Sequence, residues 1–579
     1  MRISVAANHK YIDEIQTIAQ VFFPHARFVV EDCVKLPLLT KSSKAGFIPK
    51  SDLISKSDLT PKLSFTSKSD TVSKPSVNII YRIVSIIANG KVYAEVYMHE
   101  GAPQDSDSLL NNAQHKLIGQ HRFNASGHPA YLSEKRLAML AMYHAMQQAV
   151  GAYTPWGALT GVRPTKMVRE WMAAGQTDDE ISHTLEDTFC VQKDRAQLAV
   201  DVAHAENRLA HQINTSANHM HVDKYMHHNQ SSQSRGAIYQ HEQAHEPASG
   251  ITASNTAPTP IGLYLSIPFC PSRCIYCSFN TAHKPWSKEM QTAYTQAVVR
   301  ESTTLPRKLQ ELGGHVSSIY IGGGTPTAMA NECLEQLLDA MQGFITSPIE
   351  FTVEAGRPDT ITRSNLRIMQ NYGVNRISIN PQTLNNRTLK TIGRNHTAQD
   401  FLQAFESARE EGFTCINTDI IAGLPGEAPN DMHHTMETLA KLAPENITVH
   451  TLAIKRASKL NEQRVEQSLS GCAPSGSTLS GNALPNPTVI ETQLKIAHES
   501  CINQGLSPYY LYRQKNMAAL FENTGFARPG YECLYNVGMM SEVQTVLGIG
   551  AGAVSKYIQG SLITRDFNPK DPDIYIKRQ

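Results

Sequence analysis

From residue 261 onward, the chain alternates short β-rich runs with longer stretches of helical periodicity. Segments such as NECLEQLLDAM and AQDFLQAFESAREEG place apolar residues at helical spacing. The strand candidates between them are GLYLSI (262–267), SSIYIG (317–322), EFTVEA (350–355), NRISIN (375–380), CINTDII (415–421) and NITVHTL (446–452). Six such units predict an α/β fold in which a parallel sheet with crossover helices curls into a barrel or partial barrel.

The chain before residue 261 has a different pattern. Residues 1–40 and 77–125 carry strand-like runs, including ARFVVEDCV and VNIIYRIVSIIANGKVYAEVYM, and predict a small α/β domain over 1–125. Residues 126–212 predict a helical segment, most clearly in EKRLAMLAMYHAMQQAV, where apolar residues recur at helical spacing.

Three stretches lack the composition of a folded core. Residues 41–76 repeat a Lys-Ser-Asp unit, 213–259 are rich in His, Asn, Ser and Gln, and 461–488 are of the same low-complexity kind. Such sequences bury too little apolar surface to offset the entropy of ordering. We expect a disordered insertion, a linker and a second insertion. They leave a barrel over 260–460 and a C-terminal, substrate-side extension over 489–579.

Composition and charge narrow the class of protein. Lys plus Arg number 53 and Asp plus Glu 52, so no charge excess points to a nucleic acid or an anionic membrane as partner. No apolar run is long enough to span a bilayer, and the N-terminus lacks a signal-peptide core. These features predict a cytoplasmic protein. Seven of the ten cysteines are scattered singly and are expected to be small buried side chains.

The other three cysteines are Cys270, Cys274 and Cys277, just after the first strand of the predicted barrel. A structural zinc site needs four ligands, and no second Cys-x-x-Cys pair exists. A redox pair of Cys274 and Cys277 would leave Cys270 without a role. An iron–sulfur cluster is commonly held by four thiolates, so three would leave one iron open to an exchangeable ligand.

Two further features lie at strand ends of the predicted barrel, where active sites gather in this architecture. IYIGGGTPT follows the second strand, and its glycines let a ligand approach the backbone closely. Glu354 ends the third strand and Asp419 lies in the fifth. A single strand carboxylate is more often a surface residue, but two of them near a cationic ligand make a stronger electrostatic case.

From residue 261 to about 455, and less closely to 579, the chain resembles the oxygen-independent coproporphyrinogen III oxidase family of the radical SAM superfamily. YLSIPFCPSRCIYCSFN, GGGTPT, NPQTLNNRTLKTIGRNH and DIIAGLPGE carry this resemblance. PWGALTGVRPTKMV (155–168), YYLYRQKNM (509–517) and GYECLYNVGMMSEVQTVLGIGAGAVSK (530–556) are most similar to its HemZ-type coproporphyrinogen dehydrogenases.

The resemblance implies a set of binding residues. Cys270, Cys274 and Cys277 would hold a [4Fe-4S] cluster, and the amino and carboxylate groups of S-adenosylmethionine would chelate the fourth iron. The positions implied to contact S-adenosylmethionine are Tyr264, Tyr276, Gly322, Gly323, Thr325, Glu354, Gln382, Arg394, Asp419 and Ala453, together with Val554.

The implied reaction is oxidative decarboxylation of coproporphyrinogen III to protoporphyrinogen IX, a step of heme and porphyrin biosynthesis. A 5′-deoxyadenosyl radical removes a hydrogen from the β-carbon of a propionate, and loss of CO2 and one electron leaves a vinyl group. An electron donor of the flavodoxin or ferredoxin type and an electron acceptor are implied as partners. Because the substrate carries four carboxylates, we expect fixed cations. Arg513 is predicted as the clamp over the barrel mouth, with Lys515, Lys455 and Arg456 as further candidates.

Other functions remain open. Ser278 follows the third cysteine, where anaerobic oxidases carry a further cysteine shortly afterwards, and heme chaperones of the family share this lack. A heme-binding chaperone without decarboxylase turnover is therefore the alternative, and a radical SAM enzyme with another substrate is a second. A metal buffer built on the histidines of 213–259 is disfavoured, because low-complexity drift is the commoner origin of such tracts.

Overall fold

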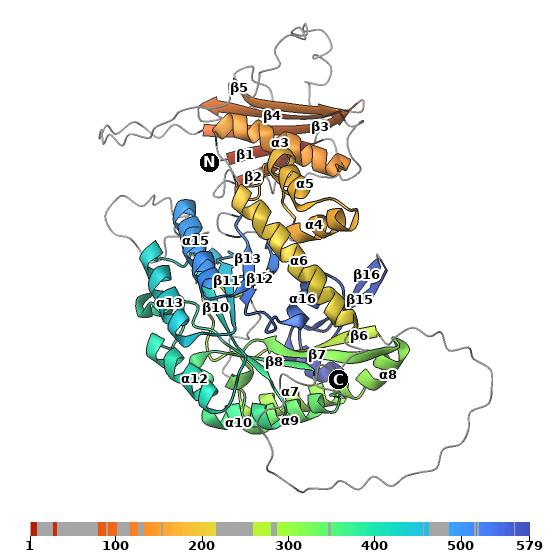
Figure 1. Ribbon diagram of the computed structural model, residues 1–579, viewed down its shortest axis with the longest axis vertical. Helices are drawn as coiled ribbons and strands as arrows, with labels where there is room; N and C mark the ends of the chain where they lie inside the picture. Colours follow the sequence, from red (N-terminus) through yellow and green to blue (C-terminus); the bar gives the residue numbers. More distant parts are fainter. Residues whose placement is uncertain are drawn as a thin grey trace, which may run out of the picture. The chain divides into compact units, whose positions relative to one another are not determined.

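The structure is a computed structural model of the chain, shown in Figure 1. It divides into two compact units, Met1–Thr160 with Leu185–Gln192, and Gly161–Thr184 with Lys193–Gln579. The residues that it describes are 2–7, 27–31, 79–88, 91–100, 116–124, 132–151, 154–161, 163–215, 259–278, 286–345, 349–455, 457–462, 486–514, 517, 520–560 and 562–579.

The first unit is built on a five-stranded mixed sheet in the order β2-β1-β3-β4-β5. Its strands are β1 (Arg2–Ala7), β2 (Arg27–Glu31), β3 (Ile79–Ala88), β4 (Lys91–Glu100) and β5 (Lys116–Asn124). The helix α3 (Glu134–Val150) packs on β4 and β5 and buries most of its apolar residues. It begins at the N-cap Ser133 and ends at Gly151, whose positive φ of 66° suits a residue without a Cβ. The described residues of 1–125 form the five strands, whereas the helix that packs on them comes from the predicted helical segment 126–212.

The helices α4 (Pro164–Ala173), α5 (Asp178–His183) and α6 (Lys193–Thr215) belong to the second unit, and a single π turn, η4 (Thr184–Thr188), follows α5. The predicted helical segment 126–212 is thus divided between the two units. Helix α5 starts with a capping box between Thr177 and Glu180, in which each side chain accepts from the other residue's backbone N–H. The predicted segments 41–76, most of 213–259 and most of 461–488 lie outside the described residues.

The second unit contains the predicted parallel sheet. Strands β6 to β11 pair in sequence order, each parallel to the next. Their bounds are β6 (Thr259–Ile267), β7 (Gly314–Gly323), β8 (Glu350–Gly356), β9 (Arg376–Ile379), β10 (Ile416–Ala422) and β11 (Asn446–Thr451). The crossover helices are α7 (Lys288–Ser302), α8 (Leu305–Glu311), α9 (Asn331–Gln342), α10 (Arg363–Asn371), α11 (Asn386–Thr391), α12 (Ala398–Glu410) and α13 (Pro429–Leu442). Short 3₁₀ turns follow β7 (η5, Pro326–Ala328) and β8 (η6, Pro358–Thr360). This arrangement confirms the partial barrel of six β/α units.

The C-terminal part extends this sheet at both edges to eleven strands. On one side, β13 (Asn523–Ala527) pairs antiparallel with β11, and β12 (Ser507–Tyr512) follows it. On the other, β14 (Thr545–Ile549) pairs parallel with β6 and leads into the hairpin of β15 (Val554–Gln559) and β16 (Leu562–Phe567). Three helices complete it, α15 (Pro487–Asn503), α16 (Leu534–Met540) and α17 (Pro572–Arg578).

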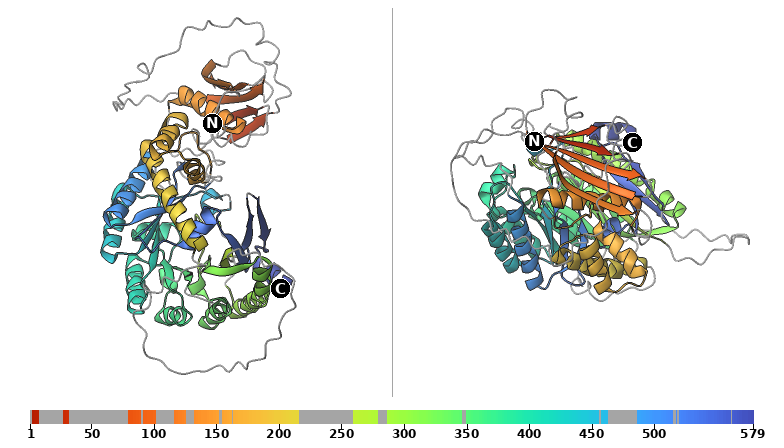
Figure 2. Two further views of the ribbon diagram at one scale, coloured as in Figure 1. Left: turned by 45° about the vertical axis from the view of Figure 1, so that its right-hand side comes forward. Right: turned by 90° about the horizontal axis from the view of Figure 1, so that it is seen from above.

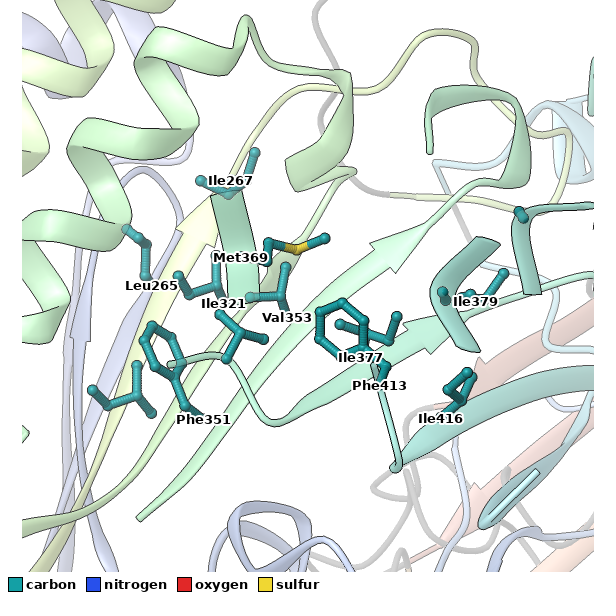
Figure 3. Close-up of a cluster of buried hydrophobic side chains, with 14 of the residues drawn as sticks. Leu265, Ile267, Ile321, Phe351, Val353, Met369, Ile377, Ile379, Phe413 and Ile416 are labelled. Atoms are coloured by element: carbon teal, nitrogen blue, oxygen red, sulfur yellow. The ribbon is translucent and has the colours of Figure 1, made fainter. Parts of the chain in front are cut away.

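The alternation of side chains along the strands separates the core from the inner face. The helices α7 to α13 cover one face of the parallel strands (Figures 1 and 2). Apolar side chains of that face, such as Leu265, Ile321, Val353 and Ile377, are fully buried in one cluster (Figure 3). Because successive residues point to opposite faces, the intervening positions, such as Tyr264, face the inside of the half-barrel. The core therefore leaves the inner face to polar and aromatic residues.

Within the part of the chain that the structure describes, no helix combines the length and the apolar character needed to cross a membrane.

Candidate functional site

A cavity of about 310 Å³ lies at the C-terminal ends of the parallel strands. The predicted site residues that line it are Cys270, Cys274, Cys277, Tyr276, Gly323, Thr325, Glu354, Gln382, Arg394 and Ala453, with the candidate cation Lys455. Strand ends and the loops after them supply all of these residues. The structure thus brings together most of the positions that the sequence scattered over almost two hundred residues.

The three cysteines lie on a loop that neighbouring backbone holds in place. Ile275, between the second and third cysteines, donates its N–H to the carbonyl of Ile392 (3.0 Å) and accepts from the N–H of Leu460 (2.9 Å). The N–H of Cys277 donates to the carbonyl of Cys274 (3.1 Å), which closes a tight turn. The cysteine side chains are thiols rather than disulfides. The loop is therefore anchored on both sides by segments far away in the sequence.

The donor set fits a cluster better than a single ion. Among the described residues, no three His, Cys, Asp or Glu side chains converge on one metal ion. A [4Fe-4S] cluster needs no such convergence, because each thiolate binds a different iron. Burial raises the pKa of the Cys270 thiol to about 11, against the hydrogen bond with Thr325 and the charge of Arg357. Iron binding at this loop therefore has to release protons.

Arginine side chains surround the loop and complement an anionic cluster. Arg357 is 3% exposed, donates from Nη1 to the Ser272 carbonyl (3.3 Å) and lies 3.7 Å from Cys274 Sγ. Among described residues, Arg357 Nη2, Arg273 Nε and Arg394 Nε are buried without a hydrogen-bond partner. Buried guanidinium groups are normally paired. Their free donors at the edge of the thiol loop support a bound group of negative charge.

The glycine run at the end of β7 is required because neighbouring groups approach its backbone closely. A Cβ on Gly322 would stand 2.8 Å from the carboxyl group of Glu354, and Gly323 has a positive φ of 103°. The N–H groups of Gly324 and Thr325 donate to the carbonyls of Ile267 and Phe269, each at 2.6 Å. Any side chain at Gly322 would push the Glu354 carboxylate away from its place.

Glu354 is the most tightly held acid of the site. Its Oε1 accepts from the hydroxyl of Tyr320 (2.6 Å) and its Oε2 from the N–H of Gly323 (3.1 Å). Burial raises the pKa of Glu354, and the charge of Asp419 adds to this, although the bonds from Tyr320 and Gly323 oppose it. A cationic ligand beside the carboxylate would reverse this shift.

Gln382 and Arg394 form the next part of the wall. Gln382 has a positive φ of 66°, and its backbone bridges to Ile420. Arg394 donates from Nη1 to the carbonyl of Asn380 (2.8 Å). This bond directs the guanidinium across the strand ends toward Tyr276 of the thiol loop, which together with Cys274 raises the pKa of Arg394 against the effect of burial.

Asp419 does not line the cavity, although its neighbour His450 does. Asp419 Oδ2 lies 3.7 Å from His450 Nε2, and Oδ1 accepts from the amide of Asn417 (2.8 Å). Burial alone would raise the pKa of Asp419, but the bonds from His450, Asn417 and Thr448 lower it. Asp419 is thus an ionised residue that contacts the cavity through His450.

Tyr264 and Val554 also lie off the cavity wall. The ring of Tyr264 stacks at 6.2 Å on Tyr535 and at 6.3 Å on Tyr320, inside the half-barrel. Since the hydroxyl of Tyr320 donates to Glu354, the stack of the three tyrosine rings helps to hold that carboxylate in place. The backbone of Val554 packs against Gly548, where a Cβ would meet it at 2.9 Å. Contacts of these two residues with S-adenosylmethionine stay a prediction.

Arg513, the predicted clamp, does not line the cavity, although its neighbours Tyr512 and Gln514 do. It is 6% exposed and donates from Nη2 to the carbonyl of Leu520 (3.1 Å). Burial lowers the pKa of Arg513 to about 10, against the charge of Glu522. Arg513 follows β12 and does not line the cavity, so its role as a carboxylate clamp stays a prediction.

Arg513 belongs instead to a buried ionic cluster beneath the wall. Glu522 is fully buried, and its Oε1 lies 3.0 Å from Nε of Arg195 at the start of α6. The guanidinium of Arg195 also lies over the ring of Phe521 at 5.6 Å. This cluster connects α6 to the ends of β12 and β13, whose residues Tyr512 and Asn523 line the cavity.

Arg513→Ala is therefore expected to lower the free energy of unfolding by about 3–5 kcal/mol, because it removes one cation of a buried ionic cluster. Denaturant unfolding measured by circular dichroism tests this. Arg367→Ala is the matched control, since Arg367 is an exposed partner of Glu411 and its loss costs at most about 1 kcal/mol. An unchanged unfolding midpoint in Arg513→Ala, combined with weaker substrate binding, would return this residue to the site.

Several lining residues were missed from the sequence. Arg357 follows β8 directly, so the rule that sites gather at strand ends could have found it. Asn380 follows β9 and His450 is the penultimate residue of β11, and both carry the same signal. Gln514 lies in YYLYRQKNM, but nothing in the sequence favoured it over Arg513 and Lys515 of the same segment, and Asn523 had no signal. Lys515 and Arg456 lie outside the described residues.

The comparison with known protein families identifies the superfamily to which the barrel belongs. Residues 264–439 match the profile of the Radical SAM superfamily. The match spans the thiol loop, the glycine run and the strands up to β10, which supply much of the cavity lining. The half-barrel and its site are thus those of a radical SAM protein.

The chain is 31% identical over 454 residues to the oxygen-independent coproporphyrinogen-III oxidase-like protein HemZ of Bacillus subtilis (strain 168), which covers 78% of this chain and 79% of that protein. It is 27% identical over 299 residues to the heme chaperone HemW of Escherichia coli (strain K12), covering 51% and 70%. Among solved structures, it is similar to the coproporphyrinogen III oxidase HemN from Escherichia coli, with a TM-score of 0.44 and 23% identity over 55% of this chain and 69% of that one.

The chain belongs to the radical SAM superfamily and, within it, to the oxygen-independent coproporphyrinogen-III oxidase-like family represented by HemZ. This confirms the resemblance found in the sequence. Members of the superfamily use a [4Fe-4S] cluster and S-adenosylmethionine, which confirms the two predicted cofactors at the level of the family.

Proposed function

We propose that the protein is an oxygen-independent coproporphyrinogen III oxidase, which converts two propionates of coproporphyrinogen III into the vinyl groups of protoporphyrinogen IX. The observation that carries the proposal is the make-up of the cavity. The thiol loop lines the cavity, together with Lys455 of the segment after β11 and with Gln514 and Asn523 of the C-terminal part. A substrate with four carboxylates needs such fixed donors within reach of the cluster.

The three thiols of Cys270, Cys274 and Cys277 are proposed as ligands of the cluster. When bound, the cluster and S-adenosylmethionine supply one-electron cleavage of the sulfonium and a carbon radical that removes hydrogen. Glu354, held by Tyr320 and Gly323, is proposed to accept a hydrogen bond from the methionyl amino group.

The remaining residues of the implied set are proposed to orient S-adenosylmethionine. Arg394 carries an unpartnered Nε at the cavity edge, where it suits a carboxylate. Gln382 and Ala453 line the strand ends beside it, and Gly323 leaves room for the ligand next to the backbone.

In the proposed reaction, each of two propionates loses a hydrogen atom from its β-carbon and then CO2 and one electron, which leaves a vinyl group. The electron leaves to an acceptor, and an external donor of the flavodoxin or ferredoxin type reduces the cluster. The residues of the chain hold the substrate so that the β-carbon meets the radical, because misplacement by about 1 Å can lower the rate about a hundredfold.

An anaerobic assay with reconstituted cluster, a reductant, S-adenosylmethionine and coproporphyrinogen III tests the proposal. We expect protoporphyrinogen IX and CO2, with one S-adenosylmethionine consumed for each vinyl group formed. Cleavage of S-adenosylmethionine without any CO2 release from this substrate would contradict the proposal.

The alternative is a heme-binding, chaperone-like protein without decarboxylase turnover. Ser278, rather than a further cysteine, follows the third thiol and lines the cavity. Heme chaperones named HemW also match the chain, one of them from Bacillus subtilis (strain 168) at 34% identity over 195 residues, 33% of this chain and 50% of that protein. Tight heme binding together with heme transfer to an acceptor protein, and no CO2 in the assay above, would favour this alternative.

A further inference from the structure

The cavity wall at the start of β13 contains a buried donor that lacks an acceptor. Asn523 is 1% exposed and lines the cavity. Among the described residues, its Nδ2 has no hydrogen-bond partner. A buried N–H group without an acceptor is costly, so its presence at a cavity wall indicates an acceptor on a ligand.

The orientation of the Asn523 side-chain amide follows from the hydrogen bond that its oxygen, Oδ1, accepts. Oδ1 accepts from the backbone N–H of Thr451 at 2.8 Å. A backbone N–H can only donate, so the oxygen must face Thr451 and the amide cannot turn over. The neighbouring Thr451 hydroxyl donates to the carbonyl of Glu522 (2.7 Å), which ties the start of β13 to the end of β11. The NH2 group is thus held in one orientation by a residue that lines the cavity.

Other donors converge on the same wall. Asn523 pairs in register with Tyr512, and the amide of Gln514 lies 3.5 Å from the Tyr512 hydroxyl. Lys455 lies four residues beyond the end of β11, is exposed and lines the cavity. Ala453, between the end of β11 and Lys455, forms an isolated β-bridge with Met517. This bridge brings the segment after β11 against the segment after β12. A cation and fixed neutral donors on one wall suit an anion with two acceptor oxygens.

We infer that Asn523 and Lys455 form a carboxylate subsite, which binds one propionate of the substrate where the segment after β11 meets the start of β13. This inference rests on the proposed function and assigns a substrate contact to residues that line the cavity. The bond to Asn523 Nδ2 sets the direction of the propionate, and Lys455 supplies the charge. The buried ionic cluster of Arg195, Glu522 and Arg513 lies directly behind this wall and keeps it in place.

The test measures binding without turnover. The anaerobically reconstituted full-length protein is titrated with coproporphyrin III, the stable oxidised tetracarboxylate, at pH 8 while porphyrin fluorescence is recorded. Asn523→Asp is the decisive variant, because its carboxylate still accepts from Thr451 but replaces the cavity-side donor with an acceptor. We expect at least a tenfold loss of affinity in Asn523→Asp and a several-fold loss in Lys455→Gln.

Two controls distinguish recognition of the carboxylates from recognition of the shape of the porphyrin. Lys459→Gln removes a lysine that is also exposed but does not line the cavity, and should bind like the wild type. The tetramethyl ester of coproporphyrin III has no carboxylates, so any binding of it should be the same in all variants. Should Asn523→Asp fail to fold, as judged by circular dichroism, Asn523→Ala and Lys455→Gln decide the question by the same titration.

Wild-type affinity for coproporphyrin III in folded Asn523→Asp and Lys455→Gln would overturn the subsite and leave the proposed function intact. Weaker binding of S-adenosylmethionine with unchanged porphyrin affinity would also overturn it, since the donor would then serve the cosubstrate. If the wild type itself binds no coproporphyrin III, both the subsite and the proposed substrate are wrong.

Discussion

Replacement of Cys270, Cys274 or Cys277 with alanine is expected to abolish reductive cleavage of S-adenosylmethionine. The three thiols stand on one anchored loop at the cavity, so each loss leaves one iron of the cluster without its protein ligand. We expect reconstituted variants to contain much less iron and sulfide than the wild type. Iron and sulfide content, visible absorption and the formation of 5′-deoxyadenosine measure these effects.

Cys190→Ala is the matched control, because this cysteine is also partly exposed and lies outside the barrel unit. It should leave cluster content and cleavage unchanged. Full cleavage activity in a variant lacking all three loop cysteines would contradict the assignment of the cluster ligands, whatever substrate the protein acts on.

Glu354→Gln is expected to weaken binding of S-adenosylmethionine roughly tenfold to a hundredfold, since a hydrogen bond to a charged group contributes about 1.5–3 kcal/mol. The carboxylate is already positioned by Tyr320 and Gly323, so the loss is one of charge rather than of geometry. Equilibrium binding to the reconstituted protein measures the effect, and iron content should stay at the wild-type level.

Tyr320→Phe provides a graded companion, because it removes only the hydroxyl that holds the carboxylate and should give a smaller loss. Glu332→Gln, at an exposed position of α9 that pairs with Lys288, is the control and should bind normally. Wild-type affinity in Glu354→Gln would remove this residue from the site, and loss of the cluster in the same variant would assign it a structural role.

The alternation of strands and helices in the barrel could be predicted from the sequence because it depends on the local periodicity of apolar residues. Each apolar run between residues 262 and 452 forms one strand of the parallel sheet, and the helical stretches between them cover one face. The spacing of Cys270, Cys274 and Cys277 on one short loop is also local, so it indicated the cluster chemistry directly. In both cases residues that act together are close in the sequence.

What the sequence did not reveal depends on contacts between distant segments. Strand β13 joins β11 and β12 joins β13 by antiparallel pairing, which brings Tyr512 and Asn523 to the cavity, whereas Arg513 does not line it. A shift of one residue along a strand exchanges its two faces, so motif similarity alone could not choose between Arg513 and its neighbours. The place of Arg357 beside Cys274 likewise exists only once β8 lies beside the thiol loop.

The sequence by itself determined the class of fold, the thiol loop and the glycine run. Strand periodicity, the spacing of ligands and the need for glycine at a close approach all depend on residues that are neighbours in the sequence. Only the tertiary structure decided which donors face the substrate. The orientation of Asn523 depends on the backbone N–H of Thr451, and the burial of Arg513 depends on Glu522 and on Arg195 of α6. Side-chain direction at a sheet edge is set by pairing partners, and those partners are chosen only when the chain folds.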